Sequence, residues 1–253
     1  MIEVKGLSKR FGEAQVLSDI SAVFRKGQVN QVIGKSGSGK SVLAKCIVGL
    51  HVPEEGEVLY DGRSFHKLGK DAKRAVRQEI GMLFQGGALF DSLNVMENVM
   101  FPLRMFGTTD VKGMRDRAEH CLHRVSITPD KHRLYPGEIS GGMQKRVGIA
   151  RAIAMQPKYL LCDEPNSGLD PQTSIVIDQL IAEITEEYSI TTIVITHDMN
   201  SVMESGDSIL FIHKGRKWWE GGREQLLHSD NKELNEFVFA GSLMRQVKGA
   251  MGG

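Results

Sequence analysis

The sequence predicts an α/β fold built on a mainly parallel sheet, and three observations predict it. A strand-like segment at 28–33 leads into a glycine-rich loop and then into a helical segment at 42–50. Apolar runs at 80–84, 159–163 and 192–195 end at or just before a polar residue, as strands buried inside a parallel sheet do. From about 90 to 158 strand signals vanish and apolar residues recur at helical spacing, which predicts a separate helical region.

The remaining elements follow from local signals. Residues 1–33 alternate strand-like runs with turns at Phe11-Gly12 and Lys26-Gly27, so we expect a small antiparallel β-layer before the glycine loop. Residues 57–60 form a further strand, and 70–79 are helical in character. Asp170-Pro171 starts a helix, because Asp suits the N-cap and Pro the first helical position. Residues 208–220 form a hairpin around Lys214-Gly215, and 226–253 form a C-terminal extension without an assigned role.

Composition limits the function classes. The chain has 253 residues, 41% apolar and 25% charged, which is ordinary for a globular protein with a real core. A net charge of +1 gives no pull toward nucleic acid, so no nucleic-acid partner is expected. Three scattered cysteines argue against a disulfide framework or a zinc site and fit a reducing cytoplasm. The chain shows no signal peptide and no run of about 18 apolar residues, so any membrane role comes through a partner.

The glycine loop matches GxxxxGK[ST] in full, at Gly34-Lys35-Ser36-Gly37-Ser38-Gly39-Lys40-Ser41. Glycines let the backbone curl so that its N–H groups face phosphate oxygens, and the following helix adds its positive end. Lys40 is placed to reach the β- and γ-phosphates, and the Ser41 hydroxyl to ligate Mg²⁺. A glycine-rich turn with a chance lysine is the alternative, but the flanking strand and helix favour the phosphate loop.

Two further loops have weaker signals when taken alone. Gln85 follows a strand and precedes a glycine pair, so its amide oxygen can reach Mg²⁺ or the attacking water; otherwise it is an ordinary loop residue. Ser140-Gly141-Gly142 precedes a helical run, which would create a second phosphate-binding surface or simply start a helix.

Two more segments place polar residues at strand exits. Asp163 and Glu164 end an apolar strand. We expect Asp163 to hold the metal through water and Glu164 to accept a proton from the attacking water. His197 follows the next buried strand and can hydrogen-bond the γ-phosphate, although a lone loop histidine is usually a bystander. Open α/β sheets bind ligands at the carboxyl ends of their strands, where all three residues would lie.

In this order the motifs resemble those of ATP-binding-cassette (ABC) ATPases, from about residue 2 to about 225. The resemblance implies ATP and Mg²⁺ as cofactors, with Gly34 to Ser41 and the adjoining Val42 as the Walker A region. It makes Gln85 the Q-loop glutamine, Ser140 to Gly142 the signature, Asp163 and Glu164 the Walker B pair, and 167–170 the D-loop. His197 becomes the switch histidine, and Phe11 falls where the family stacks an aromatic ring on adenine. The implied catalytic residues are Glu164, His197 and Gln85; the implied metal ligands are Ser41, Gln85 and Asp163.

The resemblance also implies an architecture and partners. Residues 1–90 and 159–225 would form a RecA-like ATP-binding core with the antiparallel β-layer, 91–158 a helical signature subdomain, and 226–253 the C-terminal extension. In the family the signature of one chain closes on the nucleotide held by another, so a second copy in an ATP-sandwich homodimer is expected. An integral membrane permease is the other expected partner, which would hold the chain at the cytoplasmic face of the cell membrane.

Several residues indicate which subgroup of the family the sequence resembles. The signature has Met143 where glutamine is usual, and Asn166 replaces a frequent threonine. The stretch 84–104 and the Gly-Gly-Met signature are similar to the ATPase of Mla-type phospholipid transporters, which implies lipid cargo, whereas 166–169 fit that group less well. A cassette for amino acids, metals or lipoproteins is the alternative, followed by an ABC ATPase acting on DNA or the ribosome. Those last proteins usually carry coiled coils, zinc modules or fused cassettes, which this sequence lacks.

Overall fold

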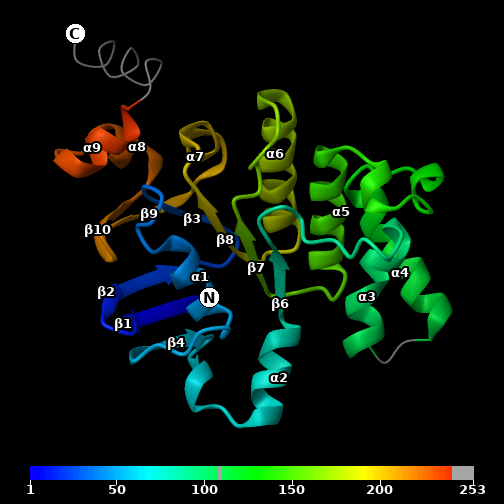
Figure 1. Ribbon diagram of the computed structural model, residues 1–253, viewed down its shortest axis with the longest axis horizontal. Coiled ribbons are helices and arrows are strands. Elements are labelled where there is room, and N and C mark those ends of the chain that lie inside the picture. The colour runs from blue at the N-terminus through cyan, green and yellow to red at the C-terminus, as the bar shows by residue number, and fades with distance from the viewer. Residues whose placement is uncertain (108–109, 241–253) are drawn as a thin grey trace.

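Two sheets and a group of helices make up the protein in this computed structural model, which describes residues 1–107 and 110–240. The smaller sheet is antiparallel, in the order β2-β1-β4-β5. Its strands are β1 (Ile2–Phe11), β2 (Ala14–Phe24), β4 (Glu55–Tyr60) and β5 (Arg63–Ser64). Figure 1 shows this sheet beside α1 and the β9–β10 edge of the larger sheet. The expected N-terminal antiparallel layer is confirmed.

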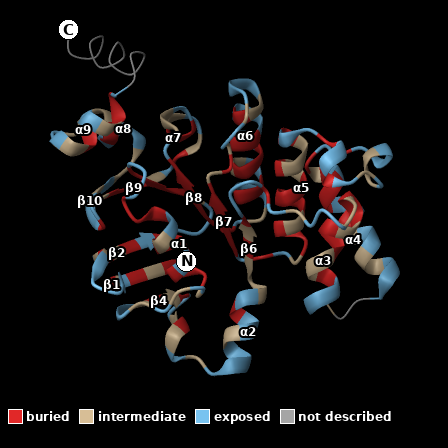
Figure 2. Ribbon diagram, in the orientation of Figure 1, coloured by how far each residue is buried: buried red, intermediate tan, exposed pale blue. Residues whose placement is uncertain are grey.

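The larger sheet has the order β10-β9-β3-β8-β7-β6. Its strands are β3 (Val29–Ile33), β6 (Ile80–Leu83), β7 (Tyr159–Asp163), β8 (Thr191–Thr196), β9 (Ser208–His213) and β10 (Arg216–Gly221). All neighbouring pairs are parallel except the edge hairpin of β9 and β10. Every residue of β3, β7 and β8 is buried, which explains why these strands have no alternation of apolar and polar residues (Figure 2). The predicted mainly parallel core sheet is therefore confirmed.

The register of the three central strands sets the position of the loops that follow them. Ile33 pairs with Thr196, and Asp163 pairs with Ile195. The chain therefore leaves the sheet at the same edge after each of these strands, and the first residues beyond them, Gly34, Glu164 and His197, are level to within about one residue. Segments far apart in sequence thus meet at the carboxyl ends of β3, β7 and β8, the edge at which open α/β sheets bind ligands.

The helices pack on the sheets and on each other. The α-helices are α1 (Lys40–Ile47), α2 (Lys70–Gln78), α3 (Val95–Phe106), α4 (Val111–Arg124), α5 (Gly141–Ile153), α6 (Pro171–Glu187), α7 (Met199–Ser205), α8 (Arg223–Leu227) and α9 (Lys232–Val238). Short 3₁₀ turns occur at Phe65–Lys67, Pro129–Lys131 and Pro136–Glu138. Helices α3, α4 and α5 form a group at one side of the molecule, next to α6 (Figure 1). Capping residues explain where two of these helices begin. Asn94 and Glu97 form a capping box at the start of α3, and the Asp170 side chain accepts a hydrogen bond from the Thr173 amide at the start of α6.

Three apolar clusters hold these layers together. One joins α3, α4, α5 and α6 to the face of β6, β7 and β8, and a second fills the space between the two sheets around α1. The third lies under the C-terminal helices and includes Phe211, Leu234 and Val238. The three cysteines are buried with free thiols in the first two clusters, at Cys46, Cys121 and Cys162.

Candidate functional site: a phosphate loop facing a carboxylate–histidine pair

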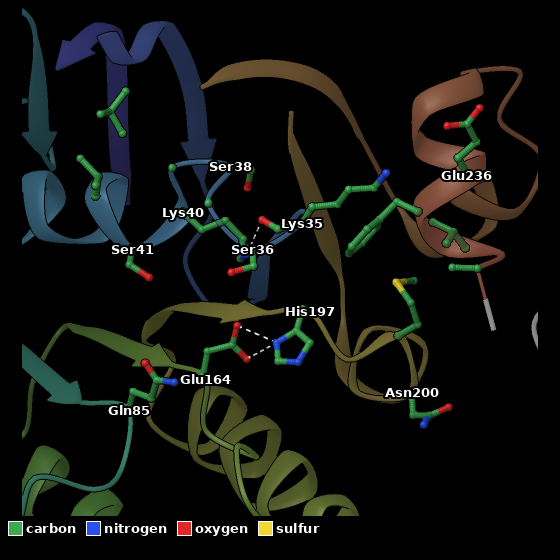
Figure 3. A pocket seen from close by; sticks show the side chains of 18 residues that line it. Lys35, Ser36, Ser38, Lys40, Ser41, Gln85, Glu164, His197, Asn200 and Glu236 are labelled. Carbon is green, nitrogen blue, oxygen red and sulfur yellow. Dashed lines mark hydrogen bonds and ion pairs between the residues drawn. The ribbon is translucent and has the colours of Figure 1, made fainter. Parts of the chain in front are cut away.

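A cavity of about 1080 Å³ opens at the carboxyl edge of the large sheet. Lys35 to Val42 line one side of it, and Gln85, Glu164 and His197 line the facing side (Figure 3). The structure therefore brings together most of the residues that the sequence singles out. The remaining walls are formed by Val16, by Met199 and Asn200 from α7, and by Glu236, Phe237, Val238 and Ala240.

The loop between β3 and α1 needs its glycines for steric reasons. A Cβ on Gly34, whose φ is +153°, would lie 2.3 Å from the Ile212 carbonyl oxygen. Gly39 has a φ of 105° and forms the N-cap of α1, so the helix starts at Lys40 with its free N–H groups facing the cavity. The curled backbone thus creates a site for an anion at a helix N-terminus.

Lys40 is buried with 7% of its surface exposed, and its Nζ donates to the carbonyls of Gly34 at 2.8 Å and Lys35 at 3.2 Å. Burial lowers the pKa of Lys40, while the nearby charges of Glu164 and Asp163 raise it and partly offset that effect. The Lys40 ammonium attracts a polyanionic ligand to the loop, whereas the two nearby carboxylates repel such a ligand unless a bound cation screens them.

Glu164 and His197 form a direct contact across the ends of β7 and β8. His197 Nδ1 lies 2.9 and 2.8 Å from the two carboxylate oxygens of Glu164. Glu164 has a left-handed backbone with a φ of +49°, which is uncommon for a residue with a side chain. Its N–H donates to the Ile195 carbonyl at 2.9 Å, so a neighbouring strand holds it in this conformation.

Asp163 lies behind the cavity wall and is 9% exposed. Burial and the adjacent Glu164 raise the pKa of Asp163, and the charges of Lys45, Lys40 and Lys145 lower it. Its Oδ1 is buried and has no hydrogen-bond partner among the described residues. An unpaired buried carboxylate oxygen is costly unless a ligand completes it.

Mg²⁺ fits this donor set. Ser41 and Gln85 contribute a hydroxyl and an amide oxygen at the cavity, and Asp163 contributes the unpaired carboxylate oxygen. These are the oxygen ligands that Mg²⁺ prefers, together with substrate phosphates. The described residues contain no cluster of three or more His, Cys, Asp and Glu side chains that could hold a metal by themselves. Phosphate oxygens would therefore have to complete the coordination.

Phe11 and the segment Ser140–Gly142 lie outside the cavity. Phe11, at the end of β1, is 46% exposed; its ring meets His51 edge-on, with the centroids 5.3 Å apart. Val16, on the next strand, lines the cavity on that side instead. Ser140 and Gly141 are exposed at the start of α5, where the Ser140 hydroxyl accepts from the Met143 amide at 3.3 Å.

Lys145 is a site residue that the sequence reasoning missed. It lies on α5 with 4% of its surface exposed, and its Nζ donates to the Glu164 carbonyl at 3.4 Å. Burial lowers its pKa, whereas Cys162, Glu164 and Asp163 raise it. A signal was present, because Lys145, Ile149 and Ala152 share one buried face at helical spacing.

Comparison with known proteins settles the family. Residues 17–167 match the family model described as ABC transporter. The chain belongs to the ABC transporter family. As a member of that family it is an ATP-hydrolysing cassette that uses ATP and Mg²⁺, as the phosphate loop and the oxygen donors lead one to expect.

The cassette is similar to several named proteins and to several solved structures. It is 38% identical to a probable ribonucleotide transport ATP-binding protein, mkl, of Mycobacterium leprae, over 94% of this chain and 68% of the relative. It is 40% identical to the methionine import ATP-binding protein MetN of Symbiobacterium thermophilum, over 94% and 73%. Among solved structures, a dimeric post-hydrolysis state of the cassette MJ0796 bound to ADP and Pi matches with a TM-score of 0.79 and 33% identity, over 88% of this chain and 98% of that one. The structure of cbiO1 from Clostridium perfringens matches with 0.83 and 27%, over 100% and 98%.

Proposed function

We propose that this cassette is the subunit that energises transport through a membrane permease, by hydrolysing ATP in the cavity at the sheet edge. The observation that supports the proposal most directly is the arrangement across that cavity. A phosphate loop with a buried lysine lies on one side, and the hydrogen-bonded Glu164–His197 pair lies on the other. No helix among the described residues is long and apolar enough to cross a membrane. A cytoplasmic chain held at the membrane by a permease is consistent with these features.

In this proposal each residue has a role set by its chemistry. Lys40 and the loop amides bind the phosphates, and Ser41, Gln85 and Asp163 hold Mg²⁺, which neutralises charge on the phosphates when bound. Glu164 accepts the proton of the attacking water, and His197 orients Glu164 and faces the terminal phosphate. Phe11, which is exposed and lies outside the cavity, is proposed to stack on adenine.

The proposal includes a second copy of the cassette, which completes the nucleotide site. Ser140 and Gly141 are exposed at the N-terminus of α5 and do not reach the cavity of their own chain. Such a terminus binds anions, so it can close on the nucleotide of a second cassette. The dimeric state of the MJ0796 structures gives a precedent. The division into a core of 1–90 and 159–225, a helical subdomain of 91–158 and a C-terminal extension of 226–253 is part of the same proposal.

Glu164→Gln tests the proposal. The amide keeps the size of the side chain and cannot accept the proton, so ATP binding should persist and turnover should fall by about 10²-fold or more. A long-lived ATP-bound dimer should accumulate, measured by phosphate release and by size-exclusion chromatography with multi-angle light scattering. Glu186→Gln, which makes the same carboxylate-to-amide change at an exposed position of α6 outside the cavity, is the control. Normal turnover in the Glu164 variant would remove this residue as the base.

For the cargo we propose phospholipid, on the strength of the 84–104 stretch and the Gly-Gly-Met signature. The relatives named for ribonucleotide and methionine transport make those two cargoes the competing candidates. The decisive experiment purifies the cassette with its permease from native membranes and measures ATP turnover in the presence of phospholipid vesicles, ribonucleotides or methionine. Stimulation by vesicles alone would support the lipid assignment. Stimulation by a small molecule alone would replace it, and a chain that purifies free of membranes would favour a non-transport ABC ATPase.

A further inference from the structure

Three polar side chains, two of them buried and one half-buried, form a hydrogen-bonded group next to the loop that carries Glu164. Asn166 Nδ2 donates to Asp178 Oδ2 at 2.8 Å and to Ser201 Oγ at 2.7 Å. The three residues come from the loop that follows Glu164, from α6 and from α7. Asp178 and Ser201 are 3% and 1% exposed, so both partners of the half-buried Asn166 are shielded from water. We call it the Asn166 network.

The network is continuous with the strand that leads into the phosphate loop. Gln31, buried in β3, donates from Nε2 to the Ser201 carbonyl at 3.0 Å. Gln31 lies three residues before Gly34. Side-chain hydrogen bonds therefore connect the phosphate-loop strand, the helix that follows His197 and the loop that follows Glu164, without touching the cavity.

Glu164 needs such support. Its left-handed backbone is a strained conformation that persists only where the surroundings hold it. The Ile195 carbonyl holds its amide, and the Ser167 amide and Lys145 both donate to its carbonyl, at 3.2 and 3.4 Å. Asn166 lies two residues further on, and its two donated hydrogen bonds fix the next turn of the chain to α6 and α7.

From these contacts we infer that Asn166, Asp178 and Ser201 are positioning residues for ATP hydrolysis. They hold the 164–169 loop in register with His197, so that the Glu164 carboxylate and the His197 ring stay within hydrogen-bond distance. The inference rests on the proposed function, because it assumes that Glu164 is the base. It predicts that loosening the network lowers turnover and leaves ATP affinity unchanged, since none of the three residues lines the cavity.

Asn166→Ala in the full chain is the principal test, with steady-state kcat and KM for Mg-ATP and the affinity of a fluorescent ATP analogue as readouts. We expect kcat to fall about tenfold, because small displacements of a base are costly, and the affinity to stay within about twofold. Asn166→Thr keeps one donor and should recover part of kcat. Combining Asn166→Ala with Ser201→Ala should cost little more than Asn166→Ala alone, because both act through one network.

Thr185→Val is the matched control. Thr185 lies on α6 as Asp178 does, is 2% exposed, and its hydroxyl bonds Thr192 at 2.6 Å and the Ile181 carbonyl at 2.7 Å, away from the cavity. Loss of the hydroxyl should lower the melting temperature and leave kcat within about twofold, because only two buried hydrogen bonds away from the cavity are removed.

The Asn166 and Glu164 variants together distinguish a failure of the positioning role from a failure of the proposed function. If Glu164→Gln abolishes turnover while Asn166→Ala behaves like Thr185→Val, or loses ATP affinity in parallel with kcat, the network is not a positioning device and the proposed function stands. If Glu164→Gln leaves turnover intact, the proposed base is wrong and the inference is overturned with it.

Discussion

Replacing Asp178 with asparagine should change how the stability of the protein depends on pH. The pKa of Asp178 is raised from 3.8 to about 6, and burial is the largest cause. Hydrogen bonds from Ser201 and Asn166 oppose this shift, and the charges of Asp198, beside α7, and Glu204, on α7, add to it. The thiol of Cys162, on β7, also interacts with this carboxylate. The folded chain therefore keeps a proton on Asp178 at pH values where the unfolded chain has released it.

The sign follows from proton linkage. Between about pH 4 and pH 6 the unfolded chain binds fewer protons at this residue, so the free energy of unfolding falls as the pH rises. A difference of 6 − 3.8, or about two pKa units, corresponds to about 3 kcal/mol over the whole window. About 2 kcal/mol of that should be lost between pH 4.5 and pH 7.5. Asparagine does not titrate, so Asp178→Asn should gain that amount relative to the unaltered chain over this range.

Urea unfolding at several pH values, followed by circular dichroism, measures this difference directly. The comparison of two chains cancels the other titrating groups. The control is Glu186→Gln, which removes an exposed carboxylate from the same helix and leaves the buried one in place. Stability curves of Asp178→Asn and the unaltered chain that stay parallel from pH 4.5 to pH 7.5 would refute the reasoning.

Two further substitutions test the cavity itself. Lys40→Ala should abolish binding of a fluorescent ATP analogue, because the buried ammonium of the loop is lost. Lys112→Ala, at an exposed position of α4 outside the cavity, is its control, and unchanged affinity and turnover in the Lys40 variant would mean that the loop is misassigned. Lys145→Met removes a buried cation whose charge lowers the pKa of Asp163, so that pKa should rise. The acid limb of the kcat–pH profile should then move to higher pH, while an unmoved profile would limit Lys145 to packing.

The sequence predicts the sheet and the phosphate loop well, because these depend on local pattern. Strands such as β7 and β8 are continuous apolar runs, and each is followed by the residue that reaches the site. The short helices α7, α8 and α9 were not predicted, since five to seven residues give too little periodicity to recognise. The contribution of α7 and α9 to the cavity wall is a tertiary property and has no local signal.

The electrostatics of the site were also beyond the sequence. Helical spacing places Lys145 on the buried face of α5, but its position beside the carboxylates of Asp163 and Glu164 depends on how distant elements pack, which has no local signal. In the sequence, Asn166 stands out only because it replaces a threonine that is frequent in the family. Its two hydrogen-bond partners lie in helices 12 and 35 residues further along the chain, a separation that no spacing rule covers.

The burial of all three cysteines has a practical consequence for following the motions of this ATPase. Burial raises the thiol pKa to about 11 for Cys46 and Cys121 and to about 12 for Cys162. At neutral pH almost none of these groups is the reactive thiolate. A cysteine introduced at the exposed position of Ser167 can therefore take a maleimide fluorophore or a spin label against the native background. Loop movement during turnover can then be recorded without a cysteine-free variant.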